Sequence, residues 1–239
     1  MKKKFLIFVS IMLVVCLMVC LTGCNNTKDT TYDTVKLTKM QNFTHLNEKM
    51  VQNEVFDNVV MIGDSIVELY NTQEQFGNVN TLNGERIVLN RGISGDTSDK
   101  MLERLDKNAL IIKPSTLFIL VGTNDVGRGI DNRSIINNIK SAVIKAKNSG
   151  VDNIVVESVY PVNHGINGKM VGSRKNSTII ELNKGIKSMT KEENVQYVDV
   201  FSHLIDSEGN FNKDLSYDGL HPNEFGYDVI SSVLLPYIK

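Results

Sequence analysis

Hydrophobic residues along the chain follow two alternating patterns. Short bursts rich in Val and Ile carry hydrophobic side chains at consecutive positions, as strands buried on both faces do; they lie at 59–62, 87–89, 116–121, 153–156 and 195–198. Between the later bursts, hydrophobic residues recur every three or four positions, at 135–144, at 179–189 and again after 222, which predicts amphipathic helices. The alternation predicts an α/β fold, a three-layer α/β/α sandwich with a central parallel sheet of about five strands.

The first 57 residues do not follow this alternation. Residues 25–34 are polar and rich in Thr, which predicts a short tether, and residues 35–57 are mostly polar with one helix expected at about 45–55. The chain has no internal repeat and no long linker. We therefore predict a leader at 1–23, an N-terminal segment at 24–57 and one α/β domain at 58–239.

The N-terminus has the pattern of a secretion signal. Three lysines precede a 17-residue apolar run at 5–21 that only Ser10 interrupts. A permanent transmembrane anchor is the alternative, since this length is at the short edge of a membrane span. The tetrapeptide LTGC at 21–24 resembles the bacterial lipobox, and the polar residues after it favour cleavage over a stop-transfer signal. We expect a signal peptide at 1–23 and a lipid anchor, with diacylglycerol and palmitate, at Cys24. The protein would then lie on the extracytoplasmic face of the bacterial cell membrane.

Cysteine content and charge exclude several kinds of protein. Of the three cysteines, Cys16 and Cys20 lie in the leader and Cys24 would carry lipid. The mature chain would therefore have no disulfide, no thiol nucleophile and no cysteine-based zinc site. The formal net charge is −1, and the loss of three lysines with the leader would make it −4. Neither value suits a nucleic-acid partner.

Candidate chemistry gathers where the predicted strands end, which is where sites form in parallel α/β sheets. Ser65, in GDS at 63–65, follows the first burst and would be either a nucleophile or a plain helix N-cap. Residues 92–98 follow the second burst, and their two glycines would allow close backbone approach or simply a positive φ. Asn124 follows the third burst; its amide could donate to an oxyanion or serve in a turn.

The last candidate is the pair Asp218 and His221. Their three-residue spacing lets the carboxylate hold one ring nitrogen while the other faces a nucleophile. A surface turn or half of a metal site would give the same spacing, but no second ligand cluster accompanies it. His45 lies upstream of the predicted domain, and His164 and His203 have no Asp at matching spacing.

Four blocks together, in this order, resemble the SGNH/GDSL hydrolase family. They are GDS at 63–65, GISGDTS at 92–98, VGTND at 121–125 and DGLHPN at 218–223. Within the family, the chain looks like the platelet-activating-factor acetylhydrolase and lysophospholipase-like esterases. The resemblance runs from about Val59 to the C-terminus and leaves 25–57 uncovered. It implies the flavodoxin-like SGNH fold and a carboxylic ester hydrolase that needs no cofactor and no metal.

The resemblance also implies a role for each site residue. Ser65 is then the nucleophile, His221 its general base, and Asp218 the group that orients the imidazole. The oxyanion hole consists of the backbone N–H groups of Ser65 and Gly95 and the side chain of Asn124. Gly92 is the other glycine candidate, but the GDT context at 95–97 favours Gly95.

Several functional readings stay open. The leading one is removal of short acyl groups, such as acetyl, from a carbohydrate or lipid ester. The alternatives are a lysophospholipase for long acyl chains and a non-catalytic surface binding protein with the same fold. A nucleotide binder that uses 92–98 as a phosphate loop would leave Asp218 and His221 unexplained. Residues 160–174, with His164, form the expected specificity loop, although a passive surface loop would have the same composition.

Overall fold

The structure is a computed structural model that describes residues 30–56, 58–81 and 84–238. Residues 36–239 form one compact unit, and residues 1–35 are grouped apart from it. The predicted signal peptide and Cys24 lie outside the described residues. Among the helices that are described, none is both long enough and apolar enough to cross a membrane.

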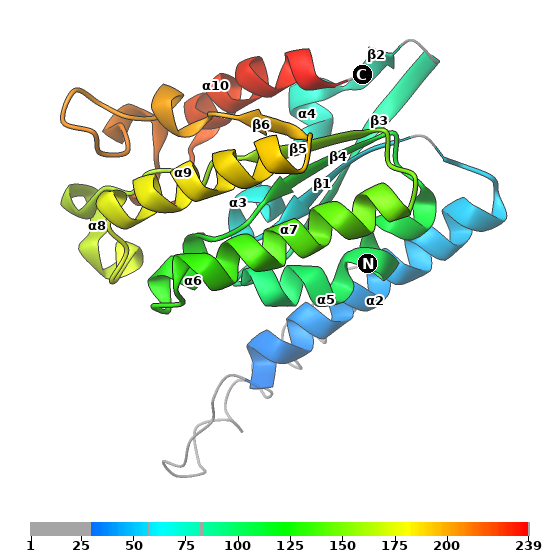
Figure 1. Cartoon of the computed structure of the whole chain (residues 1–239), viewed down its shortest axis with the longest axis horizontal. Coiled ribbons are helices and arrows are strands. Elements are labelled where there is room, and N and C mark those ends of the chain that lie inside the picture. The colour runs from blue at the N-terminus through cyan, green and yellow to red at the C-terminus, as the bar shows by residue number, and fades with distance from the viewer. Residues whose placement is uncertain (1–29, 57, 82–83, 239) are drawn as a thin grey trace, which may run out of the picture. The chain divides into compact units, whose positions relative to one another are not determined.

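The sheet has six strands in the order β2-β3-β1-β4-β5-β6 (Figure 1). Five are parallel, as predicted: β1 (Val59–Gly63), β3 (Gly84–Gly92), β4 (Thr116–Leu120), β5 (Asn153–Glu157) and β6 (Gln196–Val198). The edge strand β2 (Asn78–Thr81) is antiparallel, and its polar sequence NVNT gave no hydrophobic signal. Gly63 pairs with both Gly92 and Leu120, so β1, β3 and β4 end level with one another. Their following loops therefore meet at one edge.

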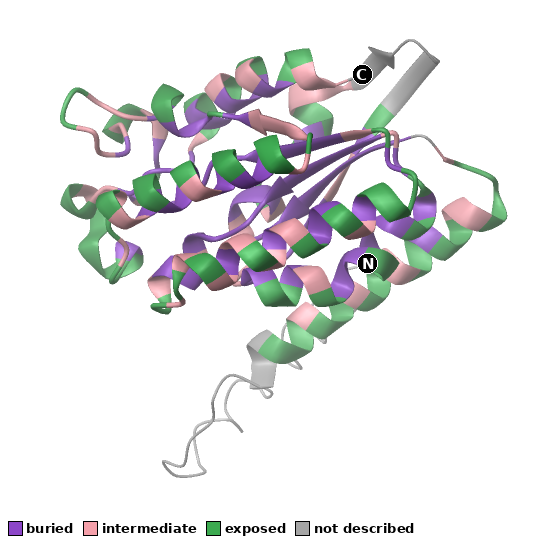
Figure 2. Cartoon of the chain, in the orientation of Figure 1, coloured by how far each residue is buried: buried purple, intermediate pink, exposed green. Residues whose placement is uncertain are grey.

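Helices cover both faces of the sheet, which confirms the three-layer prediction. Along β1, Val60 and Ile62 pack into one hydrophobic cluster, whereas Val59 and Met61 pack into the other. Because successive side chains of a strand point to opposite faces, consecutive hydrophobic residues serve both clusters. Figure 2 shows the buried strands between the two helical layers.

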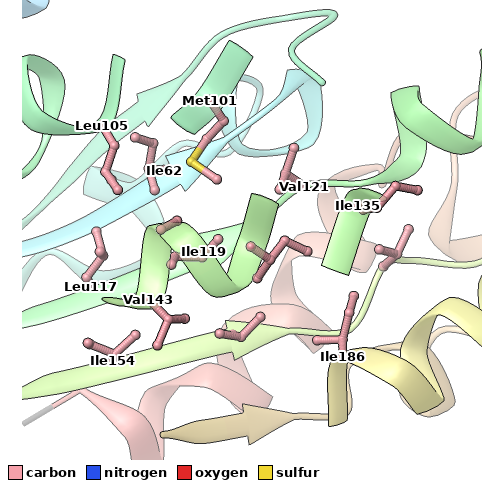
Figure 3. Packing of buried hydrophobic residues seen from close by; sticks show 14 of the residues in the cluster. Ile62, Met101, Leu105, Leu117, Ile119, Val121, Ile135, Val143, Ile154 and Ile186 are labelled. Carbon is pink, nitrogen blue, oxygen red and sulfur yellow. The ribbon is translucent and has the colours of Figure 1, made fainter. Parts of the chain in front are cut away.

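One helical layer consists of α5, α7 and α9, and the other includes α3 and α10. In Figure 3, Val143 of α7 and Met101 of α5 lie over Ile62, Leu117 and Ile119 of the sheet. The helices after α2 are α3 (Ser65–Glu68), α4 (Thr72–Phe76), α5 (Ser98–Asn108), α6 (Thr123–Gly127), α7 (Asn132–Asn148), α8 (His164–Val171), α9 (Asn176–Glu192) and α10 (Glu224–Leu234). Short 3₁₀ helices lie at Leu110–Ile112, Phe201–His203, Lys213–Leu215 and Leu235–Tyr237.

The N-terminal segment differs from the prediction. Helix α2 spans Thr30–Gln52, so residues 30–34 are helical where a tether was expected, and the helix begins well before residue 45. The helix has no strong apolar stripe that would mark its length in the sequence. Its buried residue Asn47 is polar and bonds to the carbonyl of Lys107 and to Arg91. Residues 36–57 are grouped with the α/β body, so the predicted boundary at 57 does not separate compact units.

Candidate active site

Ser65 stands at a sharp turn between β1 and α3. Asp64 caps the helix, and its Oδ1 accepts the N–H of Ile66 at 3.0 Å. The turn needs a glycine before it, because a Cβ on Gly63 would lie 2.1 Å from the carbonyl oxygen of Leu120 in β4. As the first residue of α3, Ser65 has an N–H with no carbonyl partner inside the helix. The turn thus presents a partly exposed hydroxyl beside a free backbone donor.

Ser65, His221 and Asp218 form a continuous hydrogen-bonded chain. The Oγ of Ser65 lies 3.0 Å from Nε2 of His221, and Nδ1 of His221 lies 2.9 Å from Oδ2 of Asp218. A carboxylate only accepts, so Nδ1 carries the proton and Nε2 keeps its lone pair for the serine. The structure thus brings together the three residues that the sequence singled out as nucleophile, base and orienting acid.

The histidine loop, residues 216–223, holds this geometry with contacts of its own. Oδ1 of Asp218 accepts the N–H groups of Leu220 and His221 at 3.0 and 2.8 Å. The Ser216 hydroxyl accepts from Gly219 and donates to the carbonyl of His221. Burial raises the pKa of Asp218, but its hydrogen bonds from the His221 ring and from the two N–H groups outweigh burial and lower it. Asp218 is therefore set to remain an anion beside the imidazole.

The glycine loop, residues 92–98, places Gly95 in the left-handed region at φ 73°. The N–H of Ser94 donates to Oε2 of Glu68 at 2.6 Å, and that of Asp96 donates to the carbonyl of Ile93 at 3.2 Å. Within the described part of the chain, the N–H of Gly95 between them has no acceptor. This donor remains available to a ligand.

Gly92 has a different task, inside β3. A Cβ at this position would lie 2.1 Å from the backbone nitrogen of Glu68, so the glycine lets α3 pack closely on the strand. Of the two glycine candidates, Gly92 is thus used in packing, and Gly95 is the one that offers a donor.

Asn124 adds a third donor from α6, the short helix after β4. Its Nδ2 donates to the carbonyl of Asp96 at 3.0 Å, and its Oδ1 accepts from Arg174 at 3.1 Å. Because a guanidinium only donates, Arg174 fixes which end of the amide is oxygen. Among the described residues, the second hydrogen of Nδ2 has no acceptor. The donors of Ser65, Gly95 and Asn124 thus follow β1, β3 and β4, three adjacent strands whose carboxyl ends lie at the same edge of the sheet.

Arg104 and Arg174 are supporting residues that sequence reasoning missed. Arg104 donates to Oδ2 of Asp96 at 2.6 Å and to the carbonyl of Gly63 at 2.8 Å, which joins the loops after β1 and β3. A charged residue on the apolar face of α5, between Met101 and Leu105, was the signal that could have revealed Arg104. Arg174 lies 50 positions from Asn124 and had no comparable signal.

Two further carboxyls, Asp64 and Glu157, are fully buried near the strand ends. Burial raises the pKa of each to about 7. Glu157 accepts the hydroxyl of Tyr160 at 2.6 Å, whereas Oδ2 of Asp64 has no hydrogen-bond partner among the described residues. Neither carboxyl bonds to Ser65 or His221.

The other histidines stand outside this constellation. His164 begins α8 within the expected specificity loop, and its Nε2 lies 2.7 Å from the carbonyl of Arg174. It thus contacts the backbone of the residue that orients Asn124. His45 and His203 are exposed, on α2 and on a 3₁₀ turn. In the described ranges, no three His, Cys, Asp or Glu side chains are arranged to hold a metal ion.

Comparison with known proteins places this chain in a family. The family model for the GDSL-like lipase/acylhydrolase family matches residues 61–229. Platelet-activating factor acetylhydrolase IB subunit alpha2 from Rattus norvegicus is 30% identical over 184 residues, covering 74% of this chain and 73% of that protein. An N-acylneuraminate cytidylyltransferase from Escherichia coli O18:K1:H7 is 30% identical over 212 residues, covering 85% of this chain. The chain spans about half of that relative, 46% of its length.

Solved structures share the fold. A protein from Streptococcus pneumonia, assigned as a platelet activating factor, superposes with a TM-score of 0.78 at 28% identity, covering 90% of this chain and 100% of that chain. An acetylxylan esterase from Geobacillus stearothermophilus superposes with a TM-score of 0.62 at 19% identity, covering 76% of this chain and 94% of that chain. The second likeness shows the fold alone.

Proposed function

Because the chain belongs to the GDSL-like lipase/acylhydrolase family and is an ester-cleaving hydrolase, we propose that it works through an acyl-enzyme on Ser65. The observation that carries this proposal is the hydrogen-bonded chain from Ser65 through His221 to Asp218. A serine hydroxyl is a weak nucleophile until a base takes its proton during attack. His221 suits that task because the unperturbed pKa of histidine lies near neutrality.

The first half of the reaction forms the acyl-enzyme. Oγ of Ser65 attacks the ester carbonyl carbon while Nε2 of His221 takes the hydroxyl proton, and the carbonyl oxygen becomes an anion. That anion accepts hydrogen bonds from the N–H groups of Ser65 and Gly95 and from Nδ2 of Asn124. The imidazolium, stabilised by Asp218, then gives its proton to the departing alcohol as the carbon–oxygen bond breaks.

The second half repeats these steps with water. His221 removes a proton from the water as it attacks the acyl carbon, and the same donors hold the second oxyanion. Collapse of this intermediate returns the proton to Oγ of Ser65 and releases the carboxylic acid.

For the substrate, we infer a short acyl group on a polar alcohol such as a carbohydrate. A cavity of about 410 Å³ includes Leu69, whose N–H donates to the Ser65 carbonyl, and Tyr217, which precedes Asp218. The full lining is Leu69, Asn71, Glu74, Gln75, Tyr217, Glu224 and Tyr227. Within this lining, the side chains of Asn71, Glu74, Gln75 and Glu224 can hydrogen-bond to the hydroxyl groups of a carbohydrate.

The names of two similar proteins support an acylated carbohydrate as the substrate. One relative carries an N-acylneuraminate, an acylated sugar acid, in its name, and one structure of the same fold is an acetylxylan esterase. The chain's likeness to platelet-activating factor acetylhydrolase supports a short acyl group equally.

A lipid ester is the second candidate. Leu69 and Phe225 are hydrophobic yet 55% and 66% exposed, and Leu69 lies one helical turn from Ser65. Initial rates on p-nitrophenyl acetate, butyrate and octanoate, on an acetylated oligosaccharide and on a lysophospholipid separate the two candidates. We expect the highest kcat/KM on acetyl esters; a preference for octanoate and lysophospholipid would reverse the assignment.

The acyl-enzyme is tested with a fluorophosphonate probe on the full chain. Ser65→Ala should abolish both labelling and p-nitrophenyl acetate hydrolysis, and His221→Ala should reduce both strongly. Ser232→Ala, at an exposed serine of α10, is the matched control and should label normally. Labelling that survives Ser65→Ala would show that another residue is the nucleophile.

We also propose that Cys24 carries the lipid anchor on the extracytoplasmic face of the membrane. The proposal is supported by LTGC at 21–24 after a basic and apolar leader. Expressed with radiolabelled palmitate, the wild-type chain should take up label, and Cys24→Ala should take up none and retain its leader. A wild-type chain that remains in the membrane unlabelled and uncleaved would favour the transmembrane alternative.

A further inference from the structure

Helix α2 is connected to the glycine loop by two lysines one helical turn apart, by Lys36 directly and by Lys39 through Glu68 of α3. The ammonium group of Lys36 pairs with Oδ1 of Asp96, and that of Lys39 pairs with Oε1 of Glu68. Both lysines precede residues 61–229, the segment that the family model matches. They therefore lie outside the segment that the family model covers.

The two carboxylates hold the loop on either side of Gly95. The other oxygen of Glu68, Oε2, accepts the N–H of Ser94 at 2.6 Å. Asp96 is the residue directly after Gly95, and its second oxygen, Oδ2, accepts from Arg104 at 2.6 Å. Lys36 thus pairs directly with one neighbour of Gly95, and Lys39 is connected to the other neighbour, Ser94, through Glu68.

The two ion pairs differ in burial, and the Lys36–Asp96 pair is the more buried one. The side chain of Asp96 has no exposed surface and that of Lys36 is 18% exposed, so water screens their attraction only weakly. The pair between Lys39 and Glu68 is more exposed, at 37% and 22%. Burial raises the pKa of Glu68, but the hydrogen bonds from Lys39 and Ser94 outweigh it and lower that pKa.

Other contacts already dock α2 on the body of the protein. Asn47 bonds to the carbonyl of Lys107 at 3.0 Å and to Arg91 at 2.7 Å. Asn108 of α5 donates to the carbonyl of Met40 at 3.3 Å. Because these contacts are independent of the lysines, attaching the helix does not by itself require the two ion pairs.

We propose that Lys36 and Lys39 are positioning residues that set the place of the Gly95 N–H, acting through Asp96 and Glu68. This inference rests on the proposed oxyanion hole. A donor there must lie about 2.7–3.1 Å from the oxygen of the tetrahedral intermediate. A displacement of about 1 Å can cost on the order of 100-fold in rate, so small loop movements matter.

The test replaces each lysine by methionine in the full chain, with Lys49→Met, on the exposed part of α2, as the control. We expect kcat on p-nitrophenyl acetate to fall about tenfold in Lys36→Met and about threefold in Lys39→Met, with KM within about twofold. Affinity for a trifluoromethyl ketone, whose adduct with Ser65 carries an oxyanion, should fall by the same factors. Lys36→Arg, which keeps the charge, should recover part of the loss.

A double-mutant cycle separates positioning from stability. If Lys39 acts through Glu68, adding Lys39→Met to a Glu68→Gln variant should not lower kcat further. If the two residues act independently, the fold-losses in kcat would multiply. Lysine variants that match Lys49→Met in kcat and ketone affinity would overturn the proposal. So would a loss of kcat that follows the melting temperature while ketone affinity is unchanged. Failure of the Ser65 mechanism is a separate outcome, because it would show as activity in Ser65→Ala.

Discussion

The histidine loop (216–223) and the glycine loop (92–98) serve one site but are held in opposite ways. In the histidine loop, Asp218, His221 and Ser216 bond mainly to one another and to backbone groups within five positions. In the glycine loop, the holding groups come from distant parts of the chain: Lys36, Glu68, Arg104, Asn124 and Arg128. The conformation of the histidine loop depends on a few neighbouring residues, whereas the conformation of the glycine loop depends on several residues from other parts of the chain. A single substitution should therefore reduce activity more in the histidine loop than among the residues that hold the glycine loop.

The largest effect is expected within the histidine loop. Asp218→Asn should lower kcat on p-nitrophenyl acetate by roughly 10³–10⁴. A neutral amide cannot stabilise the imidazolium, and its NH₂ group can donate to Nδ1, which favours the wrong tautomer of His221. KM should change little. The matched control is Asp214→Asn, an exposed carboxylate four positions away, which should keep full activity. A loss below tenfold at Asp218 would mean that the Ser65–His221 pair works without its carboxylate.

The contrast between local and long-range contacts also explains which elements the sequence could predict. The strands β1, β4, β5 and β6 carry consecutive hydrophobic residues, so they could be placed to within a residue or two. The three-residue spacing of Asp218 and His221 allows the contact that the structure shows at 2.9 Å. Because a surface turn has the same spacing, the pair could be expected only through the family resemblance. By contrast, β2 is polar, and α2 packs through polar contacts such as those of Asn47.

Most of the residues that hold the glycine loop could not be predicted, for a related reason. Arg104 and Lys36 reach Asp96 across 8 and 60 positions, and nothing in the local pattern of Lys36 distinguishes it from a surface lysine. Such contacts depend on the folded arrangement of the chain. The four sequence blocks therefore contain the proposed reacting groups and omit most of the residues that hold the glycine loop in place.

An intermediate loss of activity is expected at Asn124, where the hydrogen-bond donor Asn124 can be compared with Arg174, the residue that orients it. Asn124→Ala removes a hydrogen-bond donor to the oxyanion and should cost on the order of 10²–10³ in kcat. Arg174→Met leaves the donor but frees the amide to rotate, so it should cost less, roughly tenfold. The double variant should be no slower than Asn124→Ala, because Arg174 acts on the oxyanion through Asn124. A multiplicative loss in the double variant would assign Arg174 a role of its own.

The smallest effect concerns stability and involves Asp64, a buried carboxyl that belongs to neither loop. Burial raises its pKa from 3.8 to about 7, so between these values the folded chain keeps a proton that the unfolded chain has lost. The free energy of unfolding should therefore fall as pH rises from 5 to 7, by on the order of 2 kcal/mol from this group. Glu157 acts in the same direction. Asp218 and Glu68 have lowered pKa values and so change stability only at more acidic pH.

Urea unfolding at pH 5, 6, 7 and 8 checks this prediction. Asp64→Asn cannot ionise, so it should flatten the decline, and Glu157→Gln should remove a further part. Asp214→Asn, again the exposed control, should follow the wild-type curve. If the Asp64→Asn curve runs parallel to that of the wild type, Asp64 is already ionised in the folded chain at pH 5. Asp64, the residue directly before Ser65, would then hold a buried negative charge whose Oδ2 has no hydrogen-bond partner among the described residues.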